Sequence, residues 1–157
     1  MVNVMKQKAQ GATSVEFALT SMIFLLSFLA VFDFSYLFLV NLTLQHAVRE
    51  GARYAVTGQF DPATPGSAQD RCDAAIEQIK EQSMGFFEKA ASVVVFKTVN
   101  ADGSITPVPA NSCGAANQII VITVNCQLPL ISPFMRAFFT DGKYVFSVSS
   151  TMKNEAF

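Results

Sequence analysis

The sequence has little of what active sites and metal centres are usually built from. Charged residues make up 15% of its 157 residues, and His46 is the only histidine. The three cysteines show no C-x-x-C spacing, and there is no P-loop, dinucleotide-binding glycine pattern or H-E-x-x-H motif. A single imidazole without carboxylate or thiolate neighbours is not a metal site. We therefore expect no catalytic residues, no cofactor and no metal.

Proline, glycine and charge are all scarce in the first third of the chain. Between Thr13 and Thr57 there is no proline, Gly51 is the only glycine, and residues 18–32 carry no charge. About 20 apolar residues cross a bilayer as a helix, so the apolar run over residues 17–40 suffices with some tilt. One continuous helix over this part of the chain would be roughly 66 Å long. We expect a transmembrane and stalk helix at residues 12–57, with its second half outside the lipid.

Basic residues near the start of the chain indicate its orientation. Lys6 and Lys8 precede the apolar run, and the next basic residue is Arg49. The positive-inside rule then keeps the N-terminus cytoplasmic and exports the C-terminal part. No A-x-A-like signal peptidase site follows the run before Asn41, which argues against an ordinary cleaved secretory signal. Basic residues are otherwise scattered, so nucleic acid is not an expected partner.

Glu16 places a charge at the start of the apolar helix, where it is costly. A cytoplasmic-side peptidase that cuts after Gly11 would release residues 1–11 as a leader and create a new amine at Ala12. In a bundle of staggered copies, the Glu16 carboxylate can pair with the terminal amine of a neighbour. Breaking a buried pair of this kind costs several kcal/mol, so the pair would select the axial register. We predict a processing site at Gly11 and Ala12 and a register contact at Glu16 and Phe17.

Asp33 is a second acidic residue within the apolar run. A polar group at this depth needs a protein partner. Two interhelical roles are open: a neutral Asp33 bonding to a Ser or Thr of a neighbouring helix, or an intersubunit register contact with a basic residue of another subunit. We expect an interhelical role of one of these kinds.

The outer half of the long helix is amphipathic. Small and apolar residues recur at three- and four-residue steps around Gly51, where the absence of bulk would let the exported domain dock closely. Arg49, Glu50, Arg53 and Tyr54 complete this stalk motif. The two arginines form either a solvated face or contacts with a neighbouring subunit or lipid headgroups.

These motifs together resemble a known family. The pattern Lys-x-Lys-x-x-Gly-x-x-x-x-Glu-Phe before an apolar run is similar to the class III signal of type IV pilin-like proteins. Residues 11–19, Asp33-Phe34 and residues 47–55 resemble the TadE-like family, the minor pseudopilins of the tight-adherence (Tad/Flp) pilus machinery. The C-terminal residues 149–155 are also similar to the ends of such chains.

The resemblance implies a place and a set of partners. It implies a single-pass protein of the bacterial inner membrane, a periplasmic C-terminal domain and cleavage by a prepilin peptidase. Other pilins or pseudopilins, the inner-membrane pilus platform and membrane lipid are the implied partners, in assembly of an adhesive pilus at its initiation, tip or base. The alternative is a single-pass envelope protein whose exported domain binds a ligand or partner without any pilus role.

Residues 58–66, rich in proline and glycine, predict a linker, and residues 67–157 predict an exported α+β domain. We expect a helix from Ala68 to Met84 and an irregular loop around Pro107. Strands are expected at 92–99, 118–128 and 144–152. The expected fold is a pilin-like, three-stranded antiparallel sheet with one or two helices packed against it.

Three cysteines suggest one disulfide and one spare thiol, and three pairings are open. If the helix from Ala68 packs antiparallel to the first strand, Cys72 lies near Cys113, with Cys126 buried at the other end of the sheet. We therefore favour the pair Cys72–Cys113.

A cluster of apolar residues lies between the last two strands. It either caps the core of the sheet or forms an exposed patch for a partner. Its members are Phe134, Met135, Phe138 and Phe139.

Overall fold

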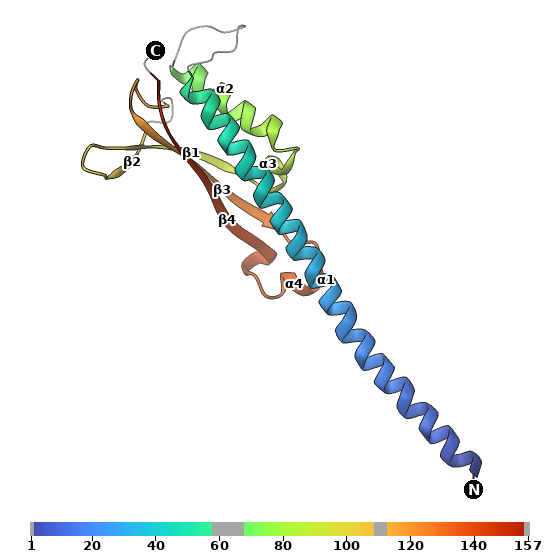
Figure 1. The fold of residues 1–157 in the computed structure, drawn as a ribbon. Coiled ribbons are helices and arrows are strands. Elements are labelled where there is room, and N and C mark those ends of the chain that lie inside the picture. Colours follow the sequence, from blue (N-terminus) through green and yellow to red (C-terminus); the bar gives the residue numbers. More distant parts are fainter. Residues whose placement is uncertain (1, 58–67, 109–112, 156–157) are drawn as a thin grey trace.

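The computed structural model describes residues 2–57, 68–108 and 113–155, and the side chains in these ranges except those of 2–10 and 68–70. One helix dominates it. Helix α1 runs from Val2 to Val56 without a break, as the lack of internal proline allows. Figure 1 shows its N-terminal half projecting alone, while the rest of the protein packs beside its C-terminal half. The expected linker at 58–66 lies outside the described residues.

The part of the chain that follows α1, expected to be the exported domain, is an α+β domain with a four-stranded antiparallel sheet. Its strands are β1 (Val93–Val99), β2 (Ile105–Pro107), β3 (Ile119–Pro129) and β4 (Lys143–Lys153), in the order β2-β1-β3-β4. The expectation of three strands was wrong by one. Strand β2 has only three residues, all with exposed side chains, and pairs Ile105 with Val99 and Pro107 with Lys97. Proline is tolerated there because β2 is an edge strand.

Three further helices complete the described part of the domain, so the expectation of one or two was too low. Helix α2 spans Ala68–Gln82, and two single-turn helices follow at α3 (Phe86–Lys89) and α4 (Pro133–Arg136). A short 3-10 turn, η1 (Thr140–Gly142), leads into β4. Helix α2 packs mainly on α1, so the expected packing of this helix against the first strand was wrong.

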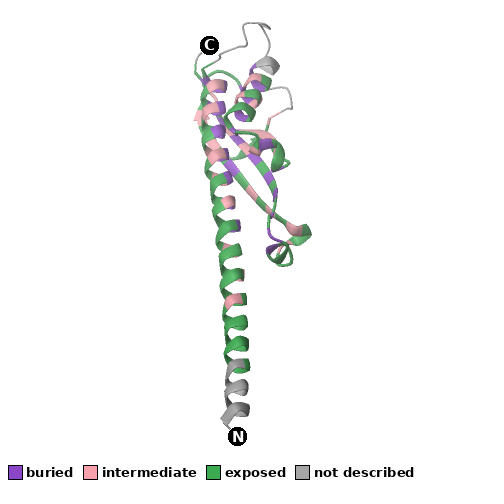
Figure 2. Ribbon diagram, turned by 90° about the vertical axis from the view of Figure 1, so that its right-hand side faces the viewer, coloured by how far each residue is buried: buried purple, intermediate pink, exposed green. Residues whose placement is uncertain are grey.

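The core lies between α1 and one face of the sheet. Alternate residues of β3 are fully buried, as the period of two requires. They meet a stripe on α1 that begins at Leu37 and recurs every three or four residues. Figure 2 shows this division of α1, which is green along its lone half and carries purple residues where it meets the domain. The main contributors are Leu37, Val40, Leu44, Val48, Ile120, Ile122, Val124 and Leu128.

Gly51 allows α2 to lie unusually close to α1. A Cβ atom at this position would meet the Cγ1 atom of Ile79 and lie 2.9 Å from the backbone oxygen of Ala75. Both atoms are too close to leave room for a Cβ atom at position 51. The residue without a Cβ therefore stands where two helix backbones approach, the expected docking point of the exported domain.

Candidate functional site

The N-terminal end of the described helix is fully accessible. Gly11, Ala12, Glu16 and Phe17 are all exposed, Phe17 to 75%, and no atom lies within 4 Å of the position that a Gly11 Cβ would take. Among the described residues, no cation lies within ion-pair distance of the Glu16 carboxyl group. The structure brings no part of the exported domain to this end, so the roles predicted for these four residues stay predictions.

Asp33 is bound within its own chain. It is the first buried residue along the described part of α1, with 2% of its surface exposed. Its Oδ1 atom accepts hydrogen bonds of 3.2 Å from the backbone N–H groups of Ile131 and Ser132, and Oδ2 accepts a third from the Ser132 hydroxyl. The predicted alternative of a bond to a Ser of a neighbouring helix is matched within the chain, because Ser132 is the N-cap residue of α4. A register contact between subunits stays a prediction. A turn that precedes α4, about a hundred residues away in sequence, provides the donors.

The same serine begins α4. The Ser132 Oγ atom accepts a 3.2 Å hydrogen bond from the Met135 N–H, and Pro133 occupies the first helical position, where a missing N–H costs nothing. Asp33 and this N-cap therefore form one connected network that fastens α4 to α1. A short turn or helix from Pro133 is predictable from the sequence, whereas the N-cap role of Ser132 was not predicted.

The aromatic segment divides between the two roles that the sequence left open. Met135 is buried in the core and Phe139 packs against it, at 6.1 Å between its ring and that of Tyr144. Phe134 and Phe138 instead stay 40% and 69% exposed, and their rings meet edge to face at 5.1 Å. One side of the segment therefore caps the core, and the other presents phenyl rings outward.

The stalk motif also has two sides. Gly51 is buried under α2, whereas Arg49 and Arg53 are exposed and Glu50 and Tyr54 are half-buried. In the described part of the chain, neither arginine forms an ion pair. Both are thus open to solvent, and contact with a neighbouring subunit or lipid stays a prediction.

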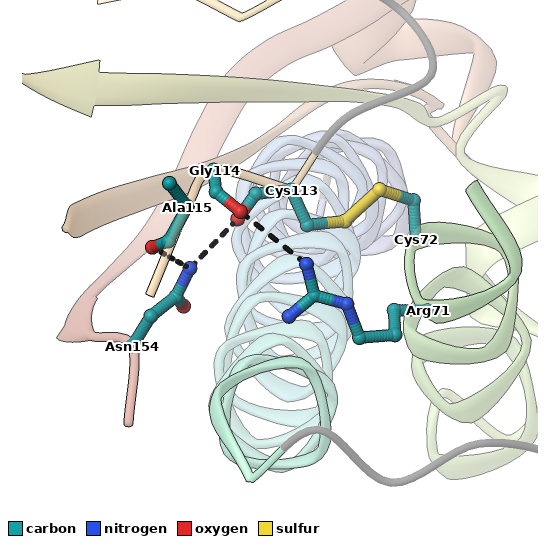
Figure 3. The surroundings of a disulfide bond; sticks show 6 residues. All are labelled: Arg71, Cys72, Cys113, Gly114, Ala115 and Asn154. Atoms are coloured by element: carbon teal, nitrogen blue, oxygen red, sulfur yellow. Dashed lines mark hydrogen bonds between the residues drawn. A yellow bond between two sulfur atoms is a disulfide. The ribbon is translucent and has the colours of Figure 1, made fainter. Parts of the chain in front are cut away.

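A disulfide joins Cys72 of α2 to Cys113, with 5.6 Å between their Cα atoms, and Cys126 is free and buried. This is the pairing favoured from the sequence. Figure 3 shows the polar groups around it: an Arg71 N–H donates to the Gly114 oxygen at 3.3 Å, and the Asn154 amide donates to the Cys113 oxygen at 3.1 Å. Burial lowers the pKa of Arg71 from its ordinary value. Neither Arg71 nor Asn154 was predicted from the sequence to lie at this site.

These contacts tie three distant segments together. Asn154 also donates a 3.0 Å bond to the Ala115 oxygen, so the end of β4 is fixed to the segment that the disulfide attaches to α2. Arg71 and Asn154 are both buried. The arrangement stabilises the far end of the domain, and the described residues around it form no group of three metal-ligating side chains.

The structure thus defines a class of protein: a long apolar N-terminal helix, which fits a single-pass membrane anchor, with a small α+β domain built on its outer half. Residues 11–56 are long and apolar enough to cross a membrane. The family model described as TadE-like protein matches residues 11–53, the region that carries the processing motif, the apolar run and most of the stalk motif. No curated protein and no solved structure matches the chain.

Proposed function

We propose that this protein is a minor pseudopilin-like subunit that acts in the assembly of a Tad/Flp-type pilus used in adhesion. The observation that carries the proposal is the match of residues 11–53 to the TadE-like family model. The matched segment begins with the exposed processing motif at Gly11 and Ala12. The role is one of assembly rather than catalysis.

Exposure of the N-terminal motif supports the first step of the proposed assembly, which is cleavage of the leader after Gly11. A prepilin peptidase needs access to the bond between Gly11 and Ala12, and nothing in the described structure covers it. Cleavage would leave Glu16 one helical turn from a new amine, about 6 Å along the helix axis. The amine of a neighbouring pilin or pseudopilin, displaced by about this distance, would then meet the carboxylate within the membrane.

Burial in a bundle makes this pair selective. A carboxylate exposed to lipid is costly, whereas one paired with a neighbour's amine is partly compensated. Copies in other axial positions would leave both charges unpaired. The pair therefore favours one stagger between subunits held at the inner-membrane platform, with the exported domains facing the periplasm.

The proposal is tested by Edman sequencing or mass spectrometry of the membrane form, together with pilus assembly in cells. We expect Ala12 as the first residue, and Gly11→Ser should retain the leader. Glu16→Gln should be cleaved and inserted but should lose pilus assembly.

Glu81→Gln is the matched control because it makes the same chemical change on an exposed residue of helix α2, away from the apolar run and the stalk motif. It should retain assembly. A membrane form that begins at Met1, or full assembly with Glu16→Gln, would contradict the proposal and favour a plain anchored envelope protein.

A further inference from the structure

The exported domain begins before the apolar surface of α1 ends. The bonds from Asp33 to the turn before α4 fix the level along α1 at which the domain starts. Figure 1 shows that α4 is near the end of the domain that points towards the N-terminal half of α1. Beyond Asp33, however, α1 still exposes large apolar side chains. They are Phe34 at 58%, Phe38 at 67%, Leu39 at 54% and Leu42 at 48%.

The apolar surface that α1 exposes beyond Asp33 favours an overlap between the domain and the bilayer. Residues 17–32 form a helical stretch of about 24 Å. The hydrocarbon core of a bilayer is about 30 Å thick. If the paired Glu16 lies at the cytoplasmic edge of this core, an embedded segment that begins at Phe17 continues by about four residues, to Tyr36. The level of Asp33 and the turn bonded to it then lies below the surface of the hydrocarbon layer.

The part of the domain at this level is apolar on its outside. Ile131 is 59% exposed, and Phe138 and Phe134 are exposed beside it. A groove of about 360 Å³ continues this surface onto α1, lined by Phe34, Leu37, Phe38, Asn41, Phe139 and Tyr144. Arg136, the last residue of α4, and Lys143, which follows η1, are both exposed. Cations next to an apolar surface at this level would meet lipid phosphates. Tyrosine, here Tyr144 of the groove, is also favoured at the membrane interface.

We propose that residues 130–139 insert into the outer leaflet as a second membrane attachment. Ile131 and Phe138 enter the acyl region, while Arg136 and Lys143 bind lipid phosphates. The inference rests on the membrane anchor of the proposed function. Attachment at α1 alone leaves the domain free to rotate about the helix axis, and a second contact through α4 holds one face of the sheet at a defined angle to the membrane.

Lipid is the occupant that the continuity of the surface favours. Phe34 and Phe38 belong to the helix that crosses the bilayer, and they line the same groove as Phe139 of the domain. Lipid that surrounds α1 therefore reaches the groove without a gap. A second copy of the chain would have to displace this lipid.

Single tryptophans test the insertion, because the sequence contains none. Phe138→Trp places the probe on the segment, and Ile105→Trp is the matched control, since Ile105 is 58% exposed on the distant strand β2 (Figure 1). The full chain is reconstituted in phosphatidylcholine–phosphatidylglycerol vesicles with brominated acyl chains. We expect several-fold stronger quenching by bromine for the probe at position 138 than for the control, and weaker quenching by acrylamide present on both sides.

Three results would overturn the inference. Equal quenching at the two positions would place the segment in water. Protection at position 138 from both quenchers would mean that a second copy covers it. Release of the protein from the vesicles by alkaline carbonate would mean that α1 does not span the membrane. This result would contradict the membrane anchor of the proposed function, whereas the first two results contradict only the second attachment. Phe134→Trp repeats the measurement at a second site, and the Cys72–Cys113 disulfide on non-reducing gels reports the fold.

Discussion

Asp33→Ala should release α4 from α1 while leaving the rest of the domain folded. The substitution removes the acceptor for two backbone N–H groups and the Ser132 hydroxyl. A buried donor without a partner costs about 1–3 kcal/mol. The hydroxyl can rotate, and the Ile131 N–H is less enclosed than the Ser132 N–H, so the full penalty falls mainly on the Ser132 N–H. Part of it is offset because a buried carboxyl group is no longer required. We expect a net local loss of about 1–2 kcal/mol.

Hydrogen–deuterium exchange in detergent micelles measures this loss directly. Peptides covering residues 130–137 should exchange about 5- to 30-fold faster in Asp33→Ala, because each 1.36 kcal/mol is a tenfold change in the opening equilibrium. Asp33→Asn keeps one acceptor oxygen but turns an amide donor towards the other N–H and hydroxyl donors, so its effect should be intermediate.

Ser35→Ala is the control, since the Ser35 hydroxyl is exposed and donates only to the Val31 oxygen of its own helix turn. It should leave exchange in residues 130–137 unchanged. If Asp33→Ala also leaves this exchange and the unfolding midpoint unchanged, the carboxyl group does not fasten α4 to α1 and does not fix the level along α1 at which the domain starts.

Three further predictions concern the exported domain. Gly51→Ala should destabilise it by about 1–3 kcal/mol in denaturant unfolding, since the added methyl group meets α2; Gly11→Ala, in open space, should not. Replacing Cys72 and Cys113 by serine should cost about 4 kcal/mol from the 41-residue separation; if reductant lowers the stability of this variant further, the assignment is wrong. Burial raises the pKa of Cys126 above 9.0, so stability should hold below that pH and fall as pH rises past it, and the thiol should react with iodoacetamide only after unfolding.

The elements of the fold that depend on local pattern were predictable. The unbroken helix α1 follows from a stretch without proline, and β3 follows from the alternation of Ile120, Ile122 and Val124. Strand β2 was missed because its three residues bury nothing, so no hydrophobic period marks it. It forms because its backbone pairs with the edge of β1, which a local pattern does not reveal.

Long-range contacts were harder to predict for the same reason. The position of Asp33 in the apolar run predicted that it needs a partner, but the sequence alone did not place residues 131 and 132 beside it. The cysteine pair favoured from the sequence matches the structure, although the packing of α2 assumed for it does not. Cys72 lies at the same end of the sheet whether α2 packs on the first strand, as expected, or on α1, as observed. The predicted cysteine pair therefore did not depend on the wrong packing.

Because α1 supplies an entire wall of the hydrophobic core, the domain has no complete interior of its own. A fragment cut away from residues 37–56 would leave the inner face of β3 in water, so a stable soluble version must carry that half of the helix. Because α1 is one unbroken helix and is also a wall of the core, a pull along its N-terminal half would reach the sheet as one rigid displacement, without a hinge in between.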